Sequence, residues 1–203
     1  MTFNPEVVDN STLYKLLTGT VIPRPIGWIS TVDENGINNL APFSYFNMVS
    51  SEPPCVMFST RRDNNQNKDT LNNVLKTGQF VANLVSVDIA EQMNTTSAPV
   101  APNVDEFQLA GVTPVDSLLI APKRVKESKV NFECEMVHHH FIKDKNGNET
   151  ACVVIGEIKM IHIDDAILTE NNHINMEVYQ PVARLAGSFY GTLGELFSIK
   201  RAT

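Results

Sequence analysis

One unbroken stretch, residues 24–60, constrains the fold more than any other part of the sequence. It contains two runs with strand character, residues 26–32 and 37–42, joined by the polar residues 33–36. Residues 35 and 36 are Asn-Gly, the strongest short-range signal for a two-stranded hairpin. The stretch therefore predicts that the sheet of this protein begins with a tight β-hairpin.

A polar and aromatic loop is expected after this hairpin. Residues 44–47 are Ser-Tyr-Phe-Asn, which places hydroxyl, aromatic and amide groups together, and a strand is predicted over 55–60. Pro53 and Pro54 favour an extended approach to that strand, because proline restricts its own backbone and that of the preceding residue. A polar loop held between two strands is suited to binding a flat ligand with polar edges.

A helix and a strand are predicted in the next part of the chain. Asp69 is expected to cap a helix that runs to about Lys76, and Gly78 is expected to end it. The run 79–85 is predicted to be a strong strand. Near the N-terminus, residues 13–17 fit either a short helix or a lead-in strand.

The least regular part of the sequence is the excursion 94–116, which contains three prolines. Long loops inside compact domains are usually functional or disordered, which favours a lid or an arm that contacts a partner. Just before it, Asp88 and Glu91 have the spacing of a capping box and predict a short helix near Ile89.

Two long runs, 129–143 and 149–163, predict a second hairpin around Asn-Gly-Asn at 146–148. The second run is apolar on both faces over 152–155, which indicates a barrel wall covered by another element, such as a second subunit. Several strands with hairpin turns and two or three short helices indicate a mainly β protein, an antiparallel β-barrel with helical additions.

Composition excludes several classes of function. The 203 residues fit one domain, and the formal charge of −7 without a basic run disfavours nucleic acid and anionic membranes as partners. No segment has the ~20 apolar residues of a membrane helix, and the polar N-terminus does not resemble a signal peptide. Cys55, Cys134 and Cys152 lie in predicted strands and are expected to be reduced core residues of a cytoplasmic protein.

The common catalytic motifs are absent from the sequence. It has no glycine-rich dinucleotide fingerprint after a strand, no phosphate-binding Walker loop, no serine nucleophile elbow, no HExxH and no CxxC. If the protein catalyses a reaction, we expect a cofactor to carry the chemistry.

Short sequence motifs, called words below, follow residues 24–60 in a characteristic order as far as the C-terminal part of the chain. They span roughly residues 12–197, and their order and spacing are more specific than any single word. The words are Lys68-Asp69-Thr70, residues 78–84, Asp105-Glu106-Phe107 with Ala110-Gly111, residues 132–135, residues 156–158, and residues 181–187 with Tyr190. In this order they resemble the flavin reductase-like, FMN-binding split-barrel family, whose relatives include flavoredoxin.

The resemblance implies a split antiparallel β-barrel that binds FMN, with the flavin ring at the loop 44–47. Backbone groups of this loop could bind the ring edge, and Tyr45 or Phe46 could cover a ring face. The alternative is an ordinary turn with a core aromatic residue.

A flavin phosphate needs cations and backbone donors. Arg61 and Lys68 supply charge, and the predicted helix start near Lys68 supplies free N–H groups. The alternative is a solvated charged loop, which is the preferred interpretation for Arg62. Asn83, polar within an apolar strand, is expected to bind the flavin or, equally, to bond with the core backbone. The expected cofactor-binding residues are Ser44, Tyr45, Phe46, Asn47, Ser50, Ser59, Thr60, Arg61, Lys68, Thr70 and Asn83.

Other polar residues are expected to be structural. Two of the three histidines 138–140 share a strand face, but no third ligand has matching spacing, so no metal site is expected. A cluster on the hairpin face or at an interface is the default for them, and His162 could approach a substrate or partner. Arg184 is expected to pair with an acidic group.

The resemblance implies a homodimer with one FMN per subunit near the interface, and hydride or electron transfer through flavin N5. NAD(P)H is the expected donor, free flavin or a partner protein is the acceptor, and no side chain need act as acid or base. A non-enzymatic FMN-binding electron carrier or storage protein is the alternative. A third possibility is a flavin-dependent oxidase of a small molecule, similar to pyridoxamine phosphate oxidases.

Overall fold

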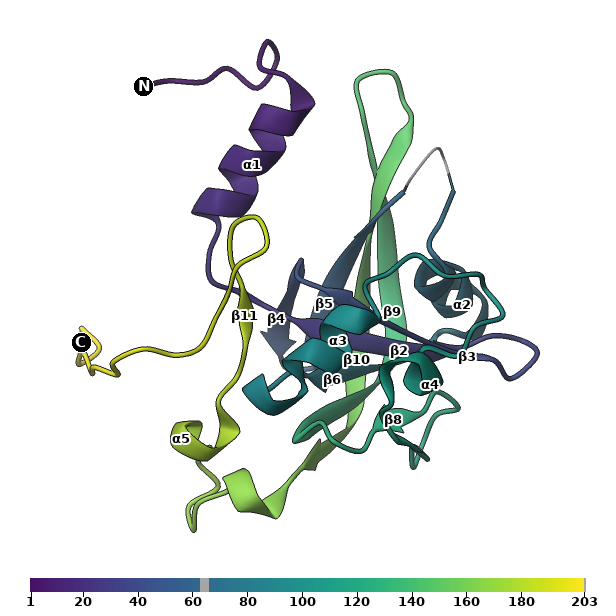
Figure 1. The fold of residues 1–203 in the computed structure, drawn as a ribbon, viewed down its shortest axis with the longest axis vertical. Helices are drawn as coiled ribbons and strands as arrows, with labels where there is room; N and C mark the ends of the chain where they lie inside the picture. The colour runs from purple at the N-terminus through teal and green to yellow at the C-terminus, as the bar shows by residue number, and fades with distance from the viewer. Residues whose placement is uncertain (63–65, 203) are drawn as a thin grey trace.

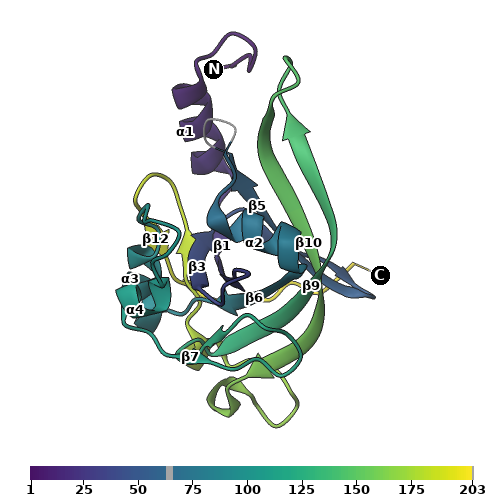
Figure 2. The same cartoon turned by 90° about the vertical axis from the view of Figure 1, so that its right-hand side faces the viewer.

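The computed structural model describes residues 1–62 and 66–202, and a seven-stranded sheet forms its centre (Figure 1). The strand order is β3-β2-β6-β9-β10-β5-β4, and every pair is antiparallel, which confirms the mainly β prediction. Seen from the side, the strands curve around α2 (Figure 2). The strands are β2 (Gly27–Val32), β3 (Asn38–Phe43), β4 (Phe46–Ser51), β5 (Pro54–Arg61), β6 (Gln79–Leu84), β9 (Val130–Lys143) and β10 (Glu149–Ile163).

Helices and short strands surround this sheet. The helix α1 stands apart from the sheet near the N-terminus, whereas α3 and α4 lie beside β2 and β3 (Figure 1). The helices are α1 (Asn10–Thr20), α2 (Asp69–Thr77), α3 (Ala90–Thr95), α4 (Glu106–Ala110) and α5 (Met176–Tyr179), with 3₁₀ turns at Val87–Ile89 and Asp165–Ile167. The short strands are β1 (Arg24–Pro25), β7 (Pro114–Val115), β8 (Arg124–Val125), β11 (Ala183–Arg184) and β12 (Tyr190–Gly191).

Both predicted hairpins are confirmed, because local turn chemistry fixes them. In the first, the Asp33 carboxylate accepts hydrogen bonds from the backbone N–H of Asn35 (2.9 Å) and of Ile37 (2.7 Å). Gly36 has a φ of +83°, which a residue with a side chain rarely adopts. In the second hairpin, β9 pairs with β10 from Lys143↔Glu149 to Val130↔Ile163, with register shifts along the way.

The prediction for residues 44–51 is partly wrong. A strand, β4, begins at Phe46 and pairs with β5, so only Ser44 and Tyr45 separate it from β3. Pro54 starts β5 directly after a turn, instead of following an extended approach. Pairing with β5 makes this segment a strand, without alternating burial: Phe46 is 7% exposed, whereas Asn47, Met48 and Val49 are all exposed.

The structure settles the helix predictions. Residues 13–17 lie in α1, whose start is capped by the Asp9 carboxylate, which accepts from Thr12 N–H (3.0 Å). Helix α2 ends at Gly78 with a φ of +71°, as predicted, but its N-cap residue is Lys68, and Asp69 is its first helical residue. Asp88 does not cap the short helix near Ile89; its carboxylate accepts from the Ser86 hydroxyl and pairs with a lysine.

Two clusters of buried residues hold these elements together. One fills the inside of the curved sheet and packs α2 against it through Leu71 and Val74, both fully buried. The other lies between the sheet and α3 and α4, where Trp28 is fully buried and its indole N–H donates to the Thr96 hydroxyl (2.8 Å). The strands β2 and β6 are therefore buried on both faces, by α2 on one side and by α3 and α4 on the other. This packing fixes the position of the segment that follows α3.

The excursion 94–116 is more ordered than predicted. It contains the end of α3, all of α4 and strand β7, and Asp105 caps α4 by accepting from Phe107 N–H (2.9 Å). Burial of Phe107 in the second cluster anchors this segment against the sheet. Across residues 1–62 and 66–202, no helix is long and apolar enough to cross a membrane.

Candidate functional site

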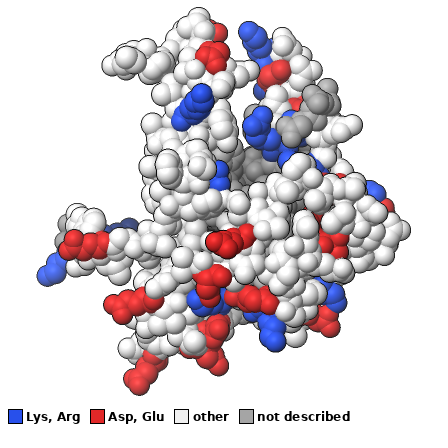
Figure 3. Space-filling view, in the orientation of Figure 1, with Lys and Arg blue, Asp and Glu red and all other residues white. Residues whose placement is uncertain are grey.

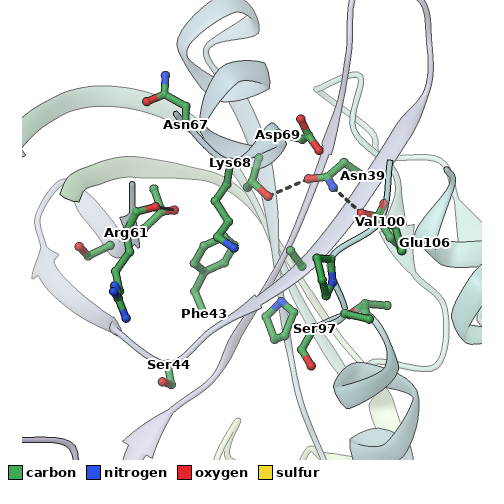
Figure 4. Close-up of a pocket in the computed structure, with 18 of the residues that line it drawn as sticks. Asn39, Phe43, Ser44, Arg61, Asn67, Lys68, Asp69, Ser97, Val100 and Glu106 are labelled. Carbon is green, nitrogen blue, oxygen red and sulfur yellow. Dashed lines mark hydrogen bonds between the residues drawn. The ribbon is translucent and has the colours of Figure 1, made fainter. Parts of the chain in front are cut away.

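A cavity of about 510 Å³ opens between the edge of the sheet, α2 and the segment that follows α3. Its walls come from the end of β3 and the turn into β4, from the end of β5, from the start of α2 and from residues 96–102. Figure 4 shows Arg61 and Lys68 on one side of this cavity and Val100 and Glu106 on the other. Its volume falls within the range of small-molecule and cofactor sites, ~300–1,000 Å³.

Seven of the eleven residues predicted to bind the cofactor line this cavity. They come from three separate segments of the chain, which only the fold brings together. These residues are Ser44, Tyr45, Ser59, Thr60, Arg61, Lys68 and Thr70.

One end of the cavity is basic and rich in backbone donors. Arg61 ends β5 and is exposed, with its guanidinium carbon 5.8 Å from the Tyr14 ring centre. Lys68 is the N-cap residue of the nine-residue helix α2, and its own side chain makes no capping hydrogen bond. The free N–H groups of a helix start carry a partial positive charge, so this end of the cavity suits an anion.

A short polar and aromatic connection lines the same cavity beside the end of β5. Ser44 and Tyr45 join β3 to β4, and the Tyr45 carbonyl accepts from Ser59 N–H (2.8 Å), which fixes the connection to β5. Phe43 lies beneath it, 8% exposed, with its ring centre 5.0 Å from that of Phe58. A rigid base with an exposed tyrosine above it can hold a flat ring.

Four residues of the predicted set lie outside this cavity. Phe46 is buried against Gly27. Asn47 is exposed on β4, and its side-chain oxygen Oδ1 accepts from Met48 N–H (2.9 Å). The Ser50 hydroxyl accepts from Glu52 N–H (3.2 Å) at the turn into β5.

Asn83 is the fourth, and its amide bonds within the core. It is fully buried, donates to the Trp28 carbonyl (2.8 Å) and the Ser30 hydroxyl (3.2 Å), and accepts from Val125 N–H (2.9 Å) and the Asn131 amide (2.9 Å). Of the two interpretations of Asn83, the geometry agrees with the core amide.

A hydrogen-bonded chain on the cavity wall escaped the sequence prediction. The Thr70 hydroxyl donates to the side-chain oxygen Oδ1 of Asn39 (2.7 Å), and the side-chain Nδ2 of Asn39 donates to the Glu106 carboxylate (2.7 Å), as Figure 4 shows. Glu106 is 5% exposed, also accepts from Leu40 N–H (3.1 Å), and its pKa is raised because burial disfavours the charged form. Glu106 lies within one of the short words, but nothing local pairs it with Asn39.

Two arginines differ from their sequence predictions. Arg62 is not a solvated charge: it forms an ion pair with Glu149 (2.6 Å), donates to Asn67 (2.7 Å) and lies 5.4 Å from the Phe141 ring centre. Arg184 does not pair with an acid within the part of the chain that the structure describes. It donates to the Tyr190 hydroxyl and the Gly187 carbonyl instead.

The histidines do not gather with other potential metal ligands among the described residues. Residues 138–140 are exposed on β9, and no group of three or more potential metal ligands occurs among residues 1–62 and 66–202. His162 lies at the far end of the hairpin, where its Nε2 is 2.6 Å from the carboxylate of the fully buried Glu133. His162 is therefore part of the core structure rather than of the cavity.

Charge is distributed unevenly over the surface. On the face seen in Figure 3, basic side chains gather around the hollow beside α1, and most acidic side chains lie on the lower half. With a net charge of −7, this local basic region sets the cavity apart from the rest of the molecule.

Comparison with known proteins agrees with this geometry. Residues 18–181 match the model of the flavin reductase like domain. A protein of Aquifex aeolicus (strain VF5) is 45% identical over 191 residues, which make up 94% of each chain. The crystal structure of nitrilotriacetate monooxygenase component B from Bacillus cereus is 34% identical, covers 98% of each chain and has a TM-score of 0.95.

A third match describes the type of barrel. A protein of Shewanella frigidimarina NCIMB 400, assigned as a flavin reductase with a split barrel domain, is 25% identical and has a TM-score of 0.84 over the whole of both chains. The curved antiparallel sheet is thus a split barrel, and the chain belongs to the flavin reductase-like domain family.

Proposed function

We propose that residues 1–203 form a single FMN-binding domain that acts as an NAD(P)H-dependent flavin reductase. Family membership supports a flavin ligand and flavin-related oxidoreductase activity. The observation that carries the finer proposal is the cavity itself, whose walls combine two cations and a helix start with a polar-aromatic connection.

The donor set fits FMN better than a flavin without phosphate. Arg61, Lys68 and the N–H groups at the start of α2 would hold the phosphate dianion, with the Ser59 hydroxyl as a further donor. Because Arg61 and Lys68 are both exposed at the rim, they can reach an anion without leaving a buried charge unpaired. Asp69 also lines the cavity, so the phosphate lies on the Arg61 side in this proposal.

The remaining walls would orient the ring. Backbone groups around Ser44 and Tyr45 would bind its polar edge, and the Tyr45 side chain, 40% exposed, would cover one face. Pro99 and Val100 on the opposite wall would exclude water from the other face. The bound flavin supplies hydride transfer between a nicotinamide and an acceptor, and the chain supplies binding, orientation and control of access.

The proposal includes a cytoplasmic homodimer. Val153 and Ile155 are half-buried on the outer face of β10, while their neighbours Cys152 and Val154 are fully buried inside the barrel. An apolar outer face on a central strand favours cover by a second subunit. The free thiols of Cys55, Cys134 and Cys152 are consistent with a reducing compartment.

Matched titrations with FMN and riboflavin test the cofactor and its orientation. Substitutions R61Q and K68Q should each weaken FMN binding at least about tenfold, the effect of one charge-assisted hydrogen bond, and leave riboflavin binding unchanged. The control K76Q removes the same charge from an exposed ion pair with Glu34 on the far end of α2. Equal loss of FMN and riboflavin affinity, or no loss for FMN, would contradict the proposed phosphate site.

Anaerobic titration of the flavin-loaded protein with NADH and NADPH tests the reductase activity. Bleaching of the flavin absorbance by either nucleotide, with steady oxidation of the nucleotide when free flavin is added, is expected of a reductase. Flavin bands that persist in the presence of both nucleotides would instead favour an electron carrier or a storage protein. Absence of any flavin binding would rule out both.

A further inference from the structure

A second, smaller cavity of about 220 Å³ adjoins the first. The two cavities share wall residues at Tyr14, Ser44 and Tyr45, so the second lies next to the connection between β3 and β4. Its remaining walls come from α1, β1, α3 and the C-terminal strands β11 and β12. None of the proposed flavin contacts uses the two arginines that line it, Arg24 and Arg184.

Arg24 is a buried cation whose contacts are all neutral. It is 7% exposed, and its guanidinium donates to the carbonyls of Thr18 (2.6 Å), Val21 (2.7 Å) and Leu185 (3.0 Å). Its Nε has no hydrogen-bond partner among residues 1–62 and 66–202. The three carbonyls join the end of α1 to the C-terminal strands, but no carboxylate within the described chain forms an ion pair with Arg24.

Arg184 is a second cation on the same cavity, and it is held in a fixed position. Its guanidinium carbon lies 4.6 Å from the ring centre of Tyr190, and it donates to the Tyr190 hydroxyl and the Gly187 carbonyl. The Tyr190 hydroxyl in turn donates to the Asn94 side chain (2.9 Å). These contacts leave further N–H donors of the guanidinium for a ligand, because the group carries five.

The two arginines give this cavity a positive charge, and no carboxylate of the described residues forms an ion pair with either. A buried guanidinium without a counter-ion is costly, and the cost falls when an anion binds. Guanidinium groups match carboxylate and phosphate oxygens bidentately. The rings of Tyr14, Tyr45 and Tyr190 also line the cavity and can contact a flat ring. At about 220 Å³ the cavity is smaller than a site for a whole drug-sized ligand, so it suits one ring with one anionic group.

We propose that this second cavity binds the anionic group and ring of a small planar ligand, with Arg184 as its direct partner and Arg24 as the buried charge behind it. That this ligand reacts with the flavin rests on the proposed function; the anion site itself does not. The anionic group is a carboxylate or a phosphate, from a free aromatic acid or from a nicotinamide nucleotide.

Calorimetric titration with benzoate, and with benzamide as its neutral counterpart of equal shape, tests the site on the protein as purified. Benzoate should bind and benzamide should bind at least about tenfold more weakly, because one charge-assisted contact is lost. R184Q should reduce benzoate affinity by a similar factor and leave benzamide unaffected. The control R201Q makes the same charge change on an exposed residue of the tail.

Further variants guard against misfolding. R184K retains the charge but loses the planar fork, so it should weaken benzoate binding less than R184Q does. Y190F removes the hydroxyl that holds Arg184 and should weaken benzoate binding as well. Circular dichroism identifies any variant that does not fold. If R184Q does not fold, benzoate binding by R184K and Y190F tests the proposal instead. Equal affinity for benzoate and benzamide, or undiminished benzoate affinity in all folded Arg184 and Tyr190 variants, would overturn the proposal.

Two more measurements separate this site from the flavin site and identify the source of the anion. FMN affinity should be unchanged in R184Q. A protein that binds benzoate through Arg184 but does not bind FMN would retain this proposal and lose the proposed function. Displacement of benzoate by NADH would assign the cavity to the nucleotide, and benzoate binding that NADH does not affect would assign it to a free aromatic acid.

Discussion

A single buried carboxylate, Glu133, joins three parts of the structure. Its side chain is fully buried on β9, where it accepts from the N–H groups of Leu118 (2.7 Å) and Leu119 (2.8 Å) and contacts His162. Burial alone would raise the pKa of Glu133, but these hydrogen bonds outweigh it and hold the pKa below its ordinary value of 4.5. The ionised carboxylate therefore stabilises the folded state.

The substitution E133Q should lower the free energy of unfolding by about 1–3 kcal/mol at pH 7. The glutamine NH₂ group would face a buried backbone N–H, so that N–H would lose its acceptor. A carboxylate with a lowered pKa contributes its stability above pH 4.5, and that contribution is lost as the pH falls through the folded-state pKa. The difference between wild type and E133Q should thus shrink in acid. Urea unfolding from pH 7 to pH 3 measures this difference, with E195Q on the exposed C-terminal tail as control. A difference that stays constant over this range would contradict the assignment.

The three thiols should be inert in the folded protein. Cys55, Cys134 and Cys152 are buried, and burial raises the pKa of the Cys134 and Cys152 thiols, so thiolate is scarce at pH 8. With Ellman's reagent we expect reaction of all three only after unfolding in denaturant. Rapid reaction of any thiol in the native protein would show that the structure around it opens.

At the scale of the elements, close packing between strands depends on glycine in β10. A Cβ atom at Gly156 would lie 2.4 Å from the ring of Phe80 and 3.1 Å from Cys134 Cβ, both of which are fully buried. Gly156 also lies at a register shift between β9 and β10, where the strands change their pairing. The barrel therefore needs the missing side chain at this position.

The substitution G156A should lower the free energy of unfolding by about 1–3 kcal/mol, the usual penalty for overpacking a core. G194A is the matched control, because a Cβ at Gly194 would have no heavy atom within 4 Å. Urea midpoints of the two variants provide the comparison. Equal midpoints would mean that the Phe80 ring moves aside without strain.

At the scale of the whole molecule, the outer face of β10 predicts the state of assembly. Sedimentation should give about twice the chain mass of 22.5 kDa, and I155D should shift the protein towards the monomer, because it would place a charge in an apolar interface. V7D, on a residue that is 80% exposed, serves as control. A wild-type monomer at micromolar concentration, or a dimer that I155D leaves intact, would contradict this interface.

How far the sequence could predict the site depended on the range of the contacts involved. The turn at Asp33 and Gly36 and the end of α2 at Gly78 were predictable, because each depends on the chemistry of a few adjacent residues. The Asn39–Glu106 contact joins residues that are 67 positions apart, and no local sequence pattern predicts it. Asn83 shows the same limit, since its four partners come from three other strands, β2, β8 and β9.

The sequence by itself determined the two hairpins, the strand β6 and the segments that carry the cavity's cations, because periodicity and turn residues act locally. The tertiary structure decided which of those residues meet. It placed Ser44, Arg61 and Lys68 around one cavity, moved Phe46 into the core, and brought Arg24 and Arg184, 160 positions apart, to the walls of another. Closure of the curved sheet sets these distances, and a closure of that kind depends on all seven strands together.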